Sequence, residues 1–160
     1  MKLIHAVAVA CASAAMLASA ADPHMMFTAK DLKWNDSPSL PGAKVAVLQG
    51  PLSEAAPFTA RIKMPDGFKI NPHWHPAIEH VTVISGKFMM GMGEKFQDKG
   101  MHTLGPGDMM IMQPKTAHFA KAKGETVVQI HGVGPWKVNY VNEADDPTKK
   151  ADAGKGEKKK

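Results

Sequence analysis

The chain has 160 residues, of which 44% are hydrophobic and 22% charged, and its formal net charge is +5. This length provides for one folded domain with a hydrophobic core and leaves no room for a second. Because Cys11 is the only cysteine, the composition excludes a disulfide-stabilised scaffold and any site built on paired thiols.

Residues 1–20 have the features of a secretory signal peptide. Lys2 gives a positively charged start, an apolar run covers residues 3–17, and Ala18-Ser19-Ala20 matches an A-x-A cleavage site. The run is too short to span a membrane, and no later segment resembles a transmembrane helix. We therefore expect an exported protein, either periplasmic or secreted. A lipoprotein anchored through Cys11 is a weaker alternative, because the apolar stretch before that residue is very short.

Residues 21–44 are predicted to form an N-terminal arm, and residues 45–142 a β domain. Apolar and polar residues alternate over 58–64 and again over 79–84, which is typical of strands with one buried face. Further short apolar runs lie at 88–92, 109–112, 117–122 and 126–133, with Gly- and Pro-rich turn signals between them. Short strands at this spacing predict an all-β fold, an antiparallel sandwich or barrel.

Four residues have the types and spacing of metal ligands. His73 and His75 are two residues apart, so on an extended chain both rings leave the same face of one strand. Pro76 interrupts regular pairing and allows a bend that returns Glu79 to the same site. His118 begins a later alternating stretch whose small alanines leave space for a cavity. Three imidazoles and a carboxylate suit one divalent transition metal ion, namely Fe, Mn, Ni, Zn or Cu, without selecting among them.

Two stretches resemble the conserved motifs of the cupin superfamily. The first matches at every ligand and glycine position, Gly67-x5-His73-x-His75-x3-Glu79-x6-Gly86. The second runs from Gly107 to His118, with Gln113 and Lys115 where many cupins carry a proline and a turn glycine. This departure concerns the turn and leaves the spacing of the histidine intact.

The resemblance covers residues 45–135 and implies a jelly-roll barrel. It also implies a divalent metal held inside that barrel by His73, His75, Glu79 and His118. Single-domain cupins often pair through their sheets, so the resemblance implies a homodimer. An exposed strand edge, with unpaired backbone groups, is a physical reason for such pairing.

Gln129 and His131 alternate along the last long apolar run and are candidates to face the cavity, as hydrogen-bonding partners of the ligands or as a proton shuttle. The alternative is that they are ordinary surface residues. His80 is expected to point away from Glu79 and to be solvated or packed. Trp136 and Tyr140 are expected to be anchors in the core or at an interface.

Methionine is enriched in two short runs, at Met89, Met90, Met92, Met109, Met110 and Met112. We expect these flexible side chains to fill an irregular core. The alternative is copper handling, because thioethers are soft ligands. An amino-terminal copper site at His24 is disfavoured, since Pro23 has no amide proton to lose.

Residues 143–160 are predicted to be a disordered, Lys-rich tail, because glycines and alanines replace side chains that could pack. The excess of lysine lies mainly in this tail and not on a basic face with interleaved aromatics, so nucleic acid is not an expected partner. A weak attraction to an anionic membrane surface is an open alternative.

Two classes of function follow from these features. In the first, the protein is a metal-dependent, dioxygenase-like enzyme that acts on a small organic molecule. In the second, it binds or senses a small ligand or the metal itself without turnover. The residues around the metal distinguish the two classes. If Gln129 and His131 point toward the metal, an enzyme is favoured. If methyl groups and thioethers surround it, a binding protein is favoured.

Overall fold

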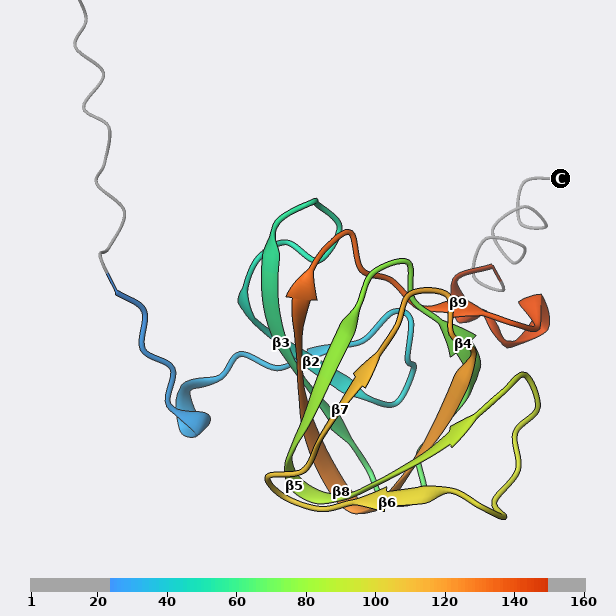
Figure 1. The fold of residues 1–160 in the computed structure, drawn as a ribbon. Coiled ribbons are helices and arrows are strands. Elements are labelled where there is room, and N and C mark those ends of the chain that lie inside the picture. Colours follow the sequence, from blue (N-terminus) through green and yellow to red (C-terminus); the bar gives the residue numbers. More distant parts are fainter. Residues whose placement is uncertain (1–23, 150–160) are drawn as a thin grey trace, which may run out of the picture.

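The computed structural model describes residues 24–149 (Figure 1). The predicted signal peptide and residues 150–160 of the predicted tail lie outside the described residues. The elements are η1 (Ala29–Asp31), β1 (Asn35–Asp36), β2 (Lys44–Gln49), β3 (Pro57–Met64), β4 (Lys69–Trp74), β5 (Glu79–Met92), β6 (His102–Leu104), β7 (Met109–Met112), β8 (His118–Val133), β9 (Asn139–Tyr140) and η2 (Glu143–Asp145).

All strand pairs are antiparallel, and the sheet curls into a barrel, as the sequence predicts (Figure 1). The strands follow the order β1-β2-β3-β8-β4-β9, and β5 pairs with β6, β7 and β8. The long strand β8 is central to this arrangement. Its first residues pair with β4, its last residues pair with β3, and β5 runs along nearly its whole length. The start of β8 is therefore fixed beside both β4 and the end of β5.

The two long strands bend together at Gly86. The register between β5 and β8 shifts on both sides of Ser85, and Gly86 has a φ of +78°. A Cβ atom at Gly86 would also clash with the backbone of Glu125 and Thr126 on β8. Glycine is required here both for its positive φ and for the close approach of the two strands.

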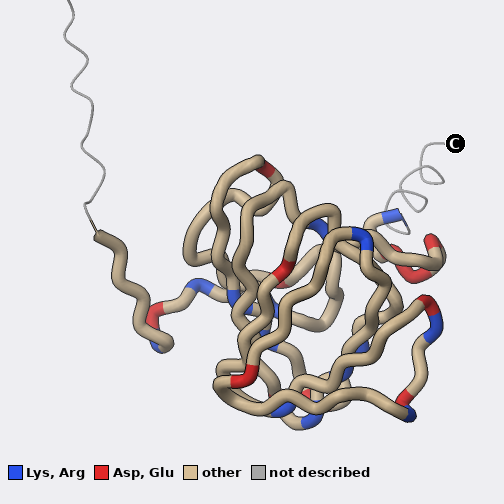
Figure 2. The backbone as a smooth tube through the Cα atoms, viewed as in Figure 1, with Lys and Arg blue, Asp and Glu red and all other residues tan. Residues whose placement is uncertain are grey.

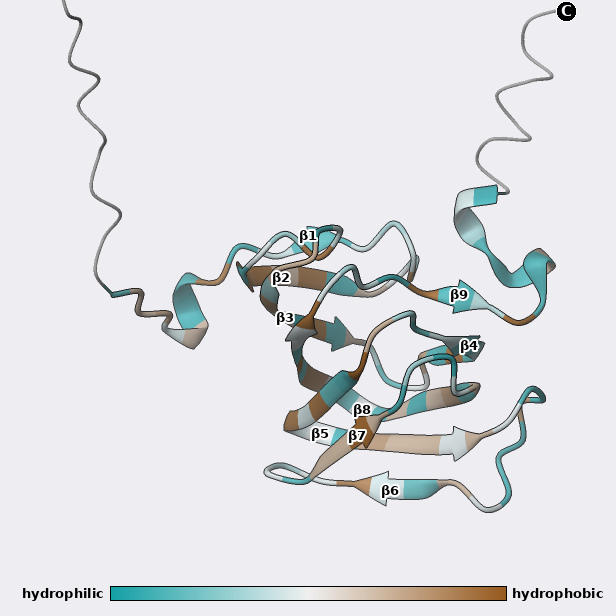
Figure 3. Ribbon diagram, turned by 45° about the horizontal axis from the view of Figure 1, so that its top comes forward, coloured by the Kyte–Doolittle hydropathy of each residue, from teal (hydrophilic) through white to brown (hydrophobic). Residues whose placement is uncertain are grey.

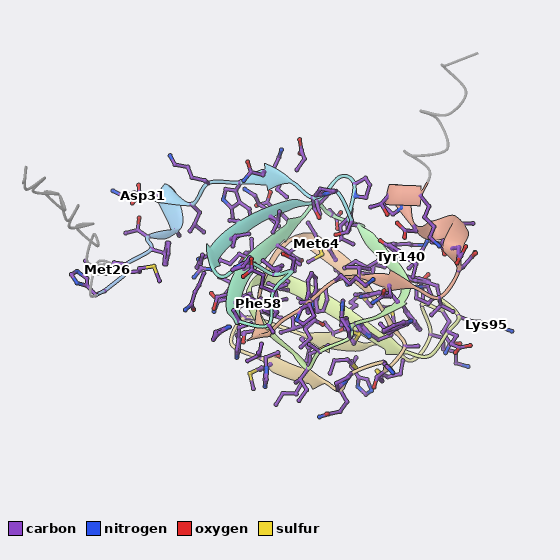
Figure 4. All side chains as sticks on the ribbon, turned by 90° about the horizontal axis from the view of Figure 1, so that it is seen from above. Met26, Asp31, Phe58, Met64, Lys95 and Tyr140 are labelled. Carbon is purple, nitrogen blue, oxygen red and sulfur yellow. The ribbon has the colours of Figure 1, made fainter. Side chains whose placement is uncertain are left out.

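The core fills the inside of the barrel with alternate residues of each strand. β3 shows this directly, because Phe58, Ala60, Ile62 and Met64 are buried while the residues between them are half-exposed. Hydrophobic stretches run along β2, β3, β5 and β8 (Figure 3). Phe58 and Met64 lie within the barrel, whereas Met26 and Asp31 lie on the arm, away from it (Figure 4).

Part of the predicted N-terminal arm joins the barrel. β1 pairs with β2, and Leu40 and Ala43 belong to the hydrophobic core. The preceding residues Met25, Met26 and Phe27 are exposed. Residues 35–43 therefore pack as part of the domain, and only the first described residues extend from it (Figure 1).

The surface of the described part carries both signs of charge. Positive and negative positions are interspersed along the backbone (Figure 2), and ion pairs such as Lys44–Asp36 and Lys121–Asp98 link neighbouring segments. Within residues 24–149, no helix has the length and hydropathy needed to cross a membrane.

Candidate metal centre

The four predicted ligands meet at one end of the barrel, where strands begin or end. His73 lies near the end of β4, His75 directly follows that strand, Glu79 opens β5 and His118 opens β8. His73 and His118 are paired across β4 and β8, which brings residues 45 positions apart in sequence into contact. All four side chains are buried, with exposed fractions between 1% and 4%.

The three imidazoles offer ligand atoms that all lie within 4.8 Å of one another, so they could hold one metal ion. The carboxylate of Glu79 stands next to this group. Its Oε2 atom lies 3.4 Å from Nε2 of His75 and 3.9 Å from Nε2 of His118. The structure thus brings all four predicted residues together, with the histidines as the tighter group.

Backbone carbonyls orient every histidine of the cluster. Nδ1 of His73 is 2.7 Å from the carbonyl oxygen of Asn71, and Nδ1 of His118 is 2.8 Å from that of Thr116. Nδ1 of His75 is 2.8 Å from the carbonyl oxygen of Lys137. A carbonyl can only accept, so each neutral ring carries its proton on Nδ1. Each Nε2 therefore keeps a free lone pair, which is what a metal ligand requires.

Burial keeps these groups neutral near pH 7. The pKa of His73 is well below its ordinary value, because of burial and then the nearby His118 and His75. Burial lowers the pKa of His75 to about 4, against the opposing effect of the Lys137 carbonyl, and it also lowers the pKa of His118. Neutral imidazoles can bind a cation without first losing a proton.

The pKa of Glu79 is shifted upward, opposite to the pKa values of the histidines. Burial raises the pKa of its carboxyl group to about 8, and the indole N–H of Trp136 opposes this effect. Within residues 24–149 no lysine or arginine forms an ion pair with Glu79 and the adjacent histidines are neutral, so its protonated form is favoured in the absence of a cation.

The ligands border a small, mostly apolar cavity of about 30 Å³. At about 10–15 Å³ for each water-sized particle, that volume admits roughly two such particles, for example an ion and one water. Trp136 forms one wall, stacked on His75 with ring centroids 4.7 Å apart and an interplanar angle of 18°. The remaining wall is built from aliphatic, aromatic and thioether side chains, namely Leu40, Ile62, Met64, Ile70, Val81, Phe88, Met90, Ala120, Val128, Ile130 and Val138.

The turn before His118 keeps its shape despite the sequence departure. Lys115 adopts a φ of 60°, the left-handed conformation that a glycine adopts more readily. Its backbone N–H donates to the carbonyl oxygen of His75 at 2.8 Å, which ties the turn to a ligand strand. With Lys115 in this conformation, His118 opens β8 beside the other predicted ligands.

The hypothesis that Gln129 and His131 face the cavity is wrong. Gln129 accepts a hydrogen bond from Nε of Arg61 at 3.1 Å, and His131 stacks on His80 at 4.7 Å; neither residue lines the metal cavity. Residues 128 and 130 carry the buried face of β8, so the residues between them face outward. Counting in steps of two from His118 would have predicted this orientation.

Sequence reasoning also missed how closely Trp136 approaches the ligands. It was expected to anchor the core or an interface, and nothing in the residues around it indicates contact with His75 and Glu79. The carbonyl acceptors were missed as well, because any residue type supplies a backbone oxygen. Of the methionines, Met90 lines the cavity and Met112 is buried in the core, whereas Met92 and Met109 are about half exposed.

Comparison with known proteins agrees with this fold. A family model described as the ChrR cupin-like domain matches residues 22–136. No curated protein gave a significant match.

Solved structures share the fold at low sequence identity. The polyketide cyclase RemF from Streptomyces resistomycificus matches with a TM-score of 0.60 and 15% identity, over 81% of this chain and 93% of that one. An RmlC-like cupin from Shewanella frigidimarina matches with a TM-score of 0.54 and 16% identity, over 77% and 96%. The Rhodobacter sphaeroides complex of SigE with the anti-sigma ChrR matches with a TM-score of 0.50 and 18% identity, over 65% and 50%.

These neighbours include both an enzyme and a regulatory complex, and at such identities they establish the fold alone. The family match covers most of the chain, and the curled antiparallel barrel and the buried histidine cluster are in accord with it. The chain belongs to the cupin superfamily, in the family of ChrR cupin-like domains.

Proposed function

We propose that the protein binds one divalent transition metal ion through His73, His75, His118 and Glu79, and that a small molecule takes an open coordination position on it. The observation that carries this proposal is the orientation of the histidines, because each Nδ1 is held by a carbonyl while the ligand nitrogens converge. The donor set suits Fe, Mn, Ni, Zn or Cu.

Binding or sensing of a small ligand or of the metal itself is the function class that the cavity supports best. Apart from the ligands, its lining offers a single polar group, the indole N–H of Trp136. Acid–base catalysis needs a further positioned proton donor or acceptor, and the cavity wall provides none among the described residues. The exclusion of Gln129 and His131 from this wall favours binding over turnover.

A dioxygenase-like enzyme is the second candidate, favoured by Glu79. A buried carboxyl group with a pKa of about 8 can exchange a proton near neutral pH. Oxygen uptake by the iron-loaded protein in the presence of small phenolic or thiol compounds would support this candidate. Metal binding without uptake would support the first.

The metal assignment predicts different effects of two neighbouring histidines. His75→Ala should remove most of the bound metal, because it deletes one of the three convergent nitrogens. His80→Ala should retain it, because His80 stacks on His131 and does not border the metal cavity. Elemental analysis of both purified variants provides the measurement. Equal metal content in the two would refute the assignment.

Proton release tests Glu79 as the fourth ligand. With a pKa of about 8, this carboxyl is mostly protonated at pH 7 and must ionise to bind a cation, whereas the buried histidines are already neutral. Zinc binding at pH 7 should therefore release about one proton, and affinity should rise with pH up to about 8 and then level off.

Calorimetric titration in two buffers of different ionisation enthalpy measures this proton. The matched variant Glu79→Gln has no carboxyl proton to lose, so its proton release should fall to near zero. Release of a full proton by Glu79→Gln would show that Glu79 is not its source.

We also propose a homodimer formed by the outer face of β5, β7 and β8. Five large hydrophobic residues on or beside this face are at least 40% exposed, namely Ile78, Ile84, Met109, Ile111 and Val133. Ile111 pairs with His80, and Met109 with Thr82, so the β7 residues continue the outer face of β5. Exposed apolar side chains gathered on one face are typical of a protein interface.

Light scattering coupled to gel filtration tests the dimer. Ile111→Glu should weaken dimerisation at least about tenfold, because a charge would be buried at the interface. The matched control is Val47→Glu, since Val47 is similarly exposed but lies on β2. A monomeric wild-type protein would contradict the proposal.

Export to the periplasm or the exterior is proposed from residues 1–20 alone. Amino-terminal sequencing of the protein from its native host should start at Ala21, and a chain that retains Met1 would contradict cleavage.

A further inference from the structure

The segment Gly134–Tyr140, which we call the C-terminal strap, crosses the barrel beside the metal centre (Figure 1). It leaves the end of β8 and includes β9, which pairs with β4 through Tyr140 and His73. The backbone N–H of Trp136 donates to the carbonyl oxygen of Leu52 at 2.6 Å. The carbonyl of Lys137 accepts from His75. The strap is therefore fixed against the barrel, and it already orients one ligand.

Trp136 is the strap residue that enters the metal cavity. Its ring stacks on His75 and lies 6.0 Å, centroid to centroid, from the ring of Phe58. Its Nε1 atom is buried and makes no hydrogen bond of normal geometry within residues 24–149. A buried donor without a partner lowers the stability of the fold, and folded proteins rarely keep one.

Among the side chains that line the cavity, one acceptor can satisfy this donor. The polar side chains on its wall are the three histidines, Glu79 and Trp136. Each histidine has its Nδ1 held by a carbonyl and its Nε2 turned toward the proposed ion. The carboxylate of Glu79 has two oxygens, so it can give one to an ion and the other to the indole N–H.

We propose that Trp136 is a positioning residue for the metal, whose indole N–H holds the carboxylate of Glu79 and whose ring holds His75. This inference rests on the proposed metal binding. Trp136 lies outside both stretches that resemble the cupin motifs, so the strap adds a support that those motifs do not contain. Partners of this kind keep ligands in place and commonly affect metal affinity by about 10–100-fold.

The proposal predicts a loss of metal affinity when the indole N–H is removed. Trp136→Phe retains a ring to stack on His75 but lacks the N–H. In metal-free protein the smaller ring leaves part of the indole's space empty, so the melting temperature should fall by a packing cost that does not depend on Glu79. In the presence of metal it removes the partner of Glu79, so the affinity for Co(II), measured by visible absorption, should fall about 10–100-fold.

Trp74→Phe is the matched control, because Trp74 stands between His73 and His75 in the sequence but does not line the metal cavity. Its Co(II) affinity should equal that of the wild type. A double-mutant cycle then assigns the effect to Glu79. In a Glu79→Leu background, where three histidines remain to bind Co(II), Trp136→Phe should cause no further loss.

The outcomes separate this inference from the proposed function. If the wild type binds no Co(II), both fail. If the wild type binds Co(II) and Trp136→Phe binds it equally well, only the role of Trp136 fails. An undiminished loss of affinity in the Glu79→Leu background would also overturn it, because that result assigns Trp136 a general packing role.

Discussion

The candidate metal centre depends on three hydrogen bonds from imidazole Nδ1–H groups to backbone carbonyls. For His73 and His118 the acceptor is the carbonyl two residues earlier, so the orientation of the ring is fixed locally. For His75 the acceptor is Lys137, 62 residues later, so that ring is fixed only once the C-terminal strap has docked. These bonds decide which nitrogen of each ring is protonated, and thereby make the cluster a set of ligands.

The same burial that organises the site makes it unfavourable for charge. Every side chain of the centre loses solvent, so the histidines resist protonation and Glu79 resists ionisation. A bound divalent cation would favour the ionised form of Glu79 over the protonated form, because it supplies the charge partner that the apolar wall lacks. The site is thus a neutral cluster that a positive ion completes.

The fold and the ligand cluster were predictable because both follow from short-range patterns. Alternation over 58–64 indicates which face of β3 is buried, and the spacing of His73, His75 and Glu79 indicates a shared site. The sequence left open whether Gln129 and His131 face the cavity or the surface, although the two-residue period of β8 was enough to decide for the surface. The role of Trp136 was not predictable, since its contacts depend on how the strap crosses the barrel. Contacts between segments far apart in the chain leave little trace in the local sequence pattern. Backbone carbonyl acceptors leave none, because every residue type has one.

The near-complete burial of the four side chains also bears on when an ion can enter or leave. Burial of the ligands would slow the exchange of a bound ion, and local opening of the barrel end would speed it at a rate set by the contacts that hold the strap and the adjoining loops. An ion enclosed during folding would therefore dissociate slowly, even where a competing metal binds more tightly at equilibrium. A metal bound in the proposed way would reflect the supply in the compartment where the protein folds, as much as the intrinsic preference of its ligands.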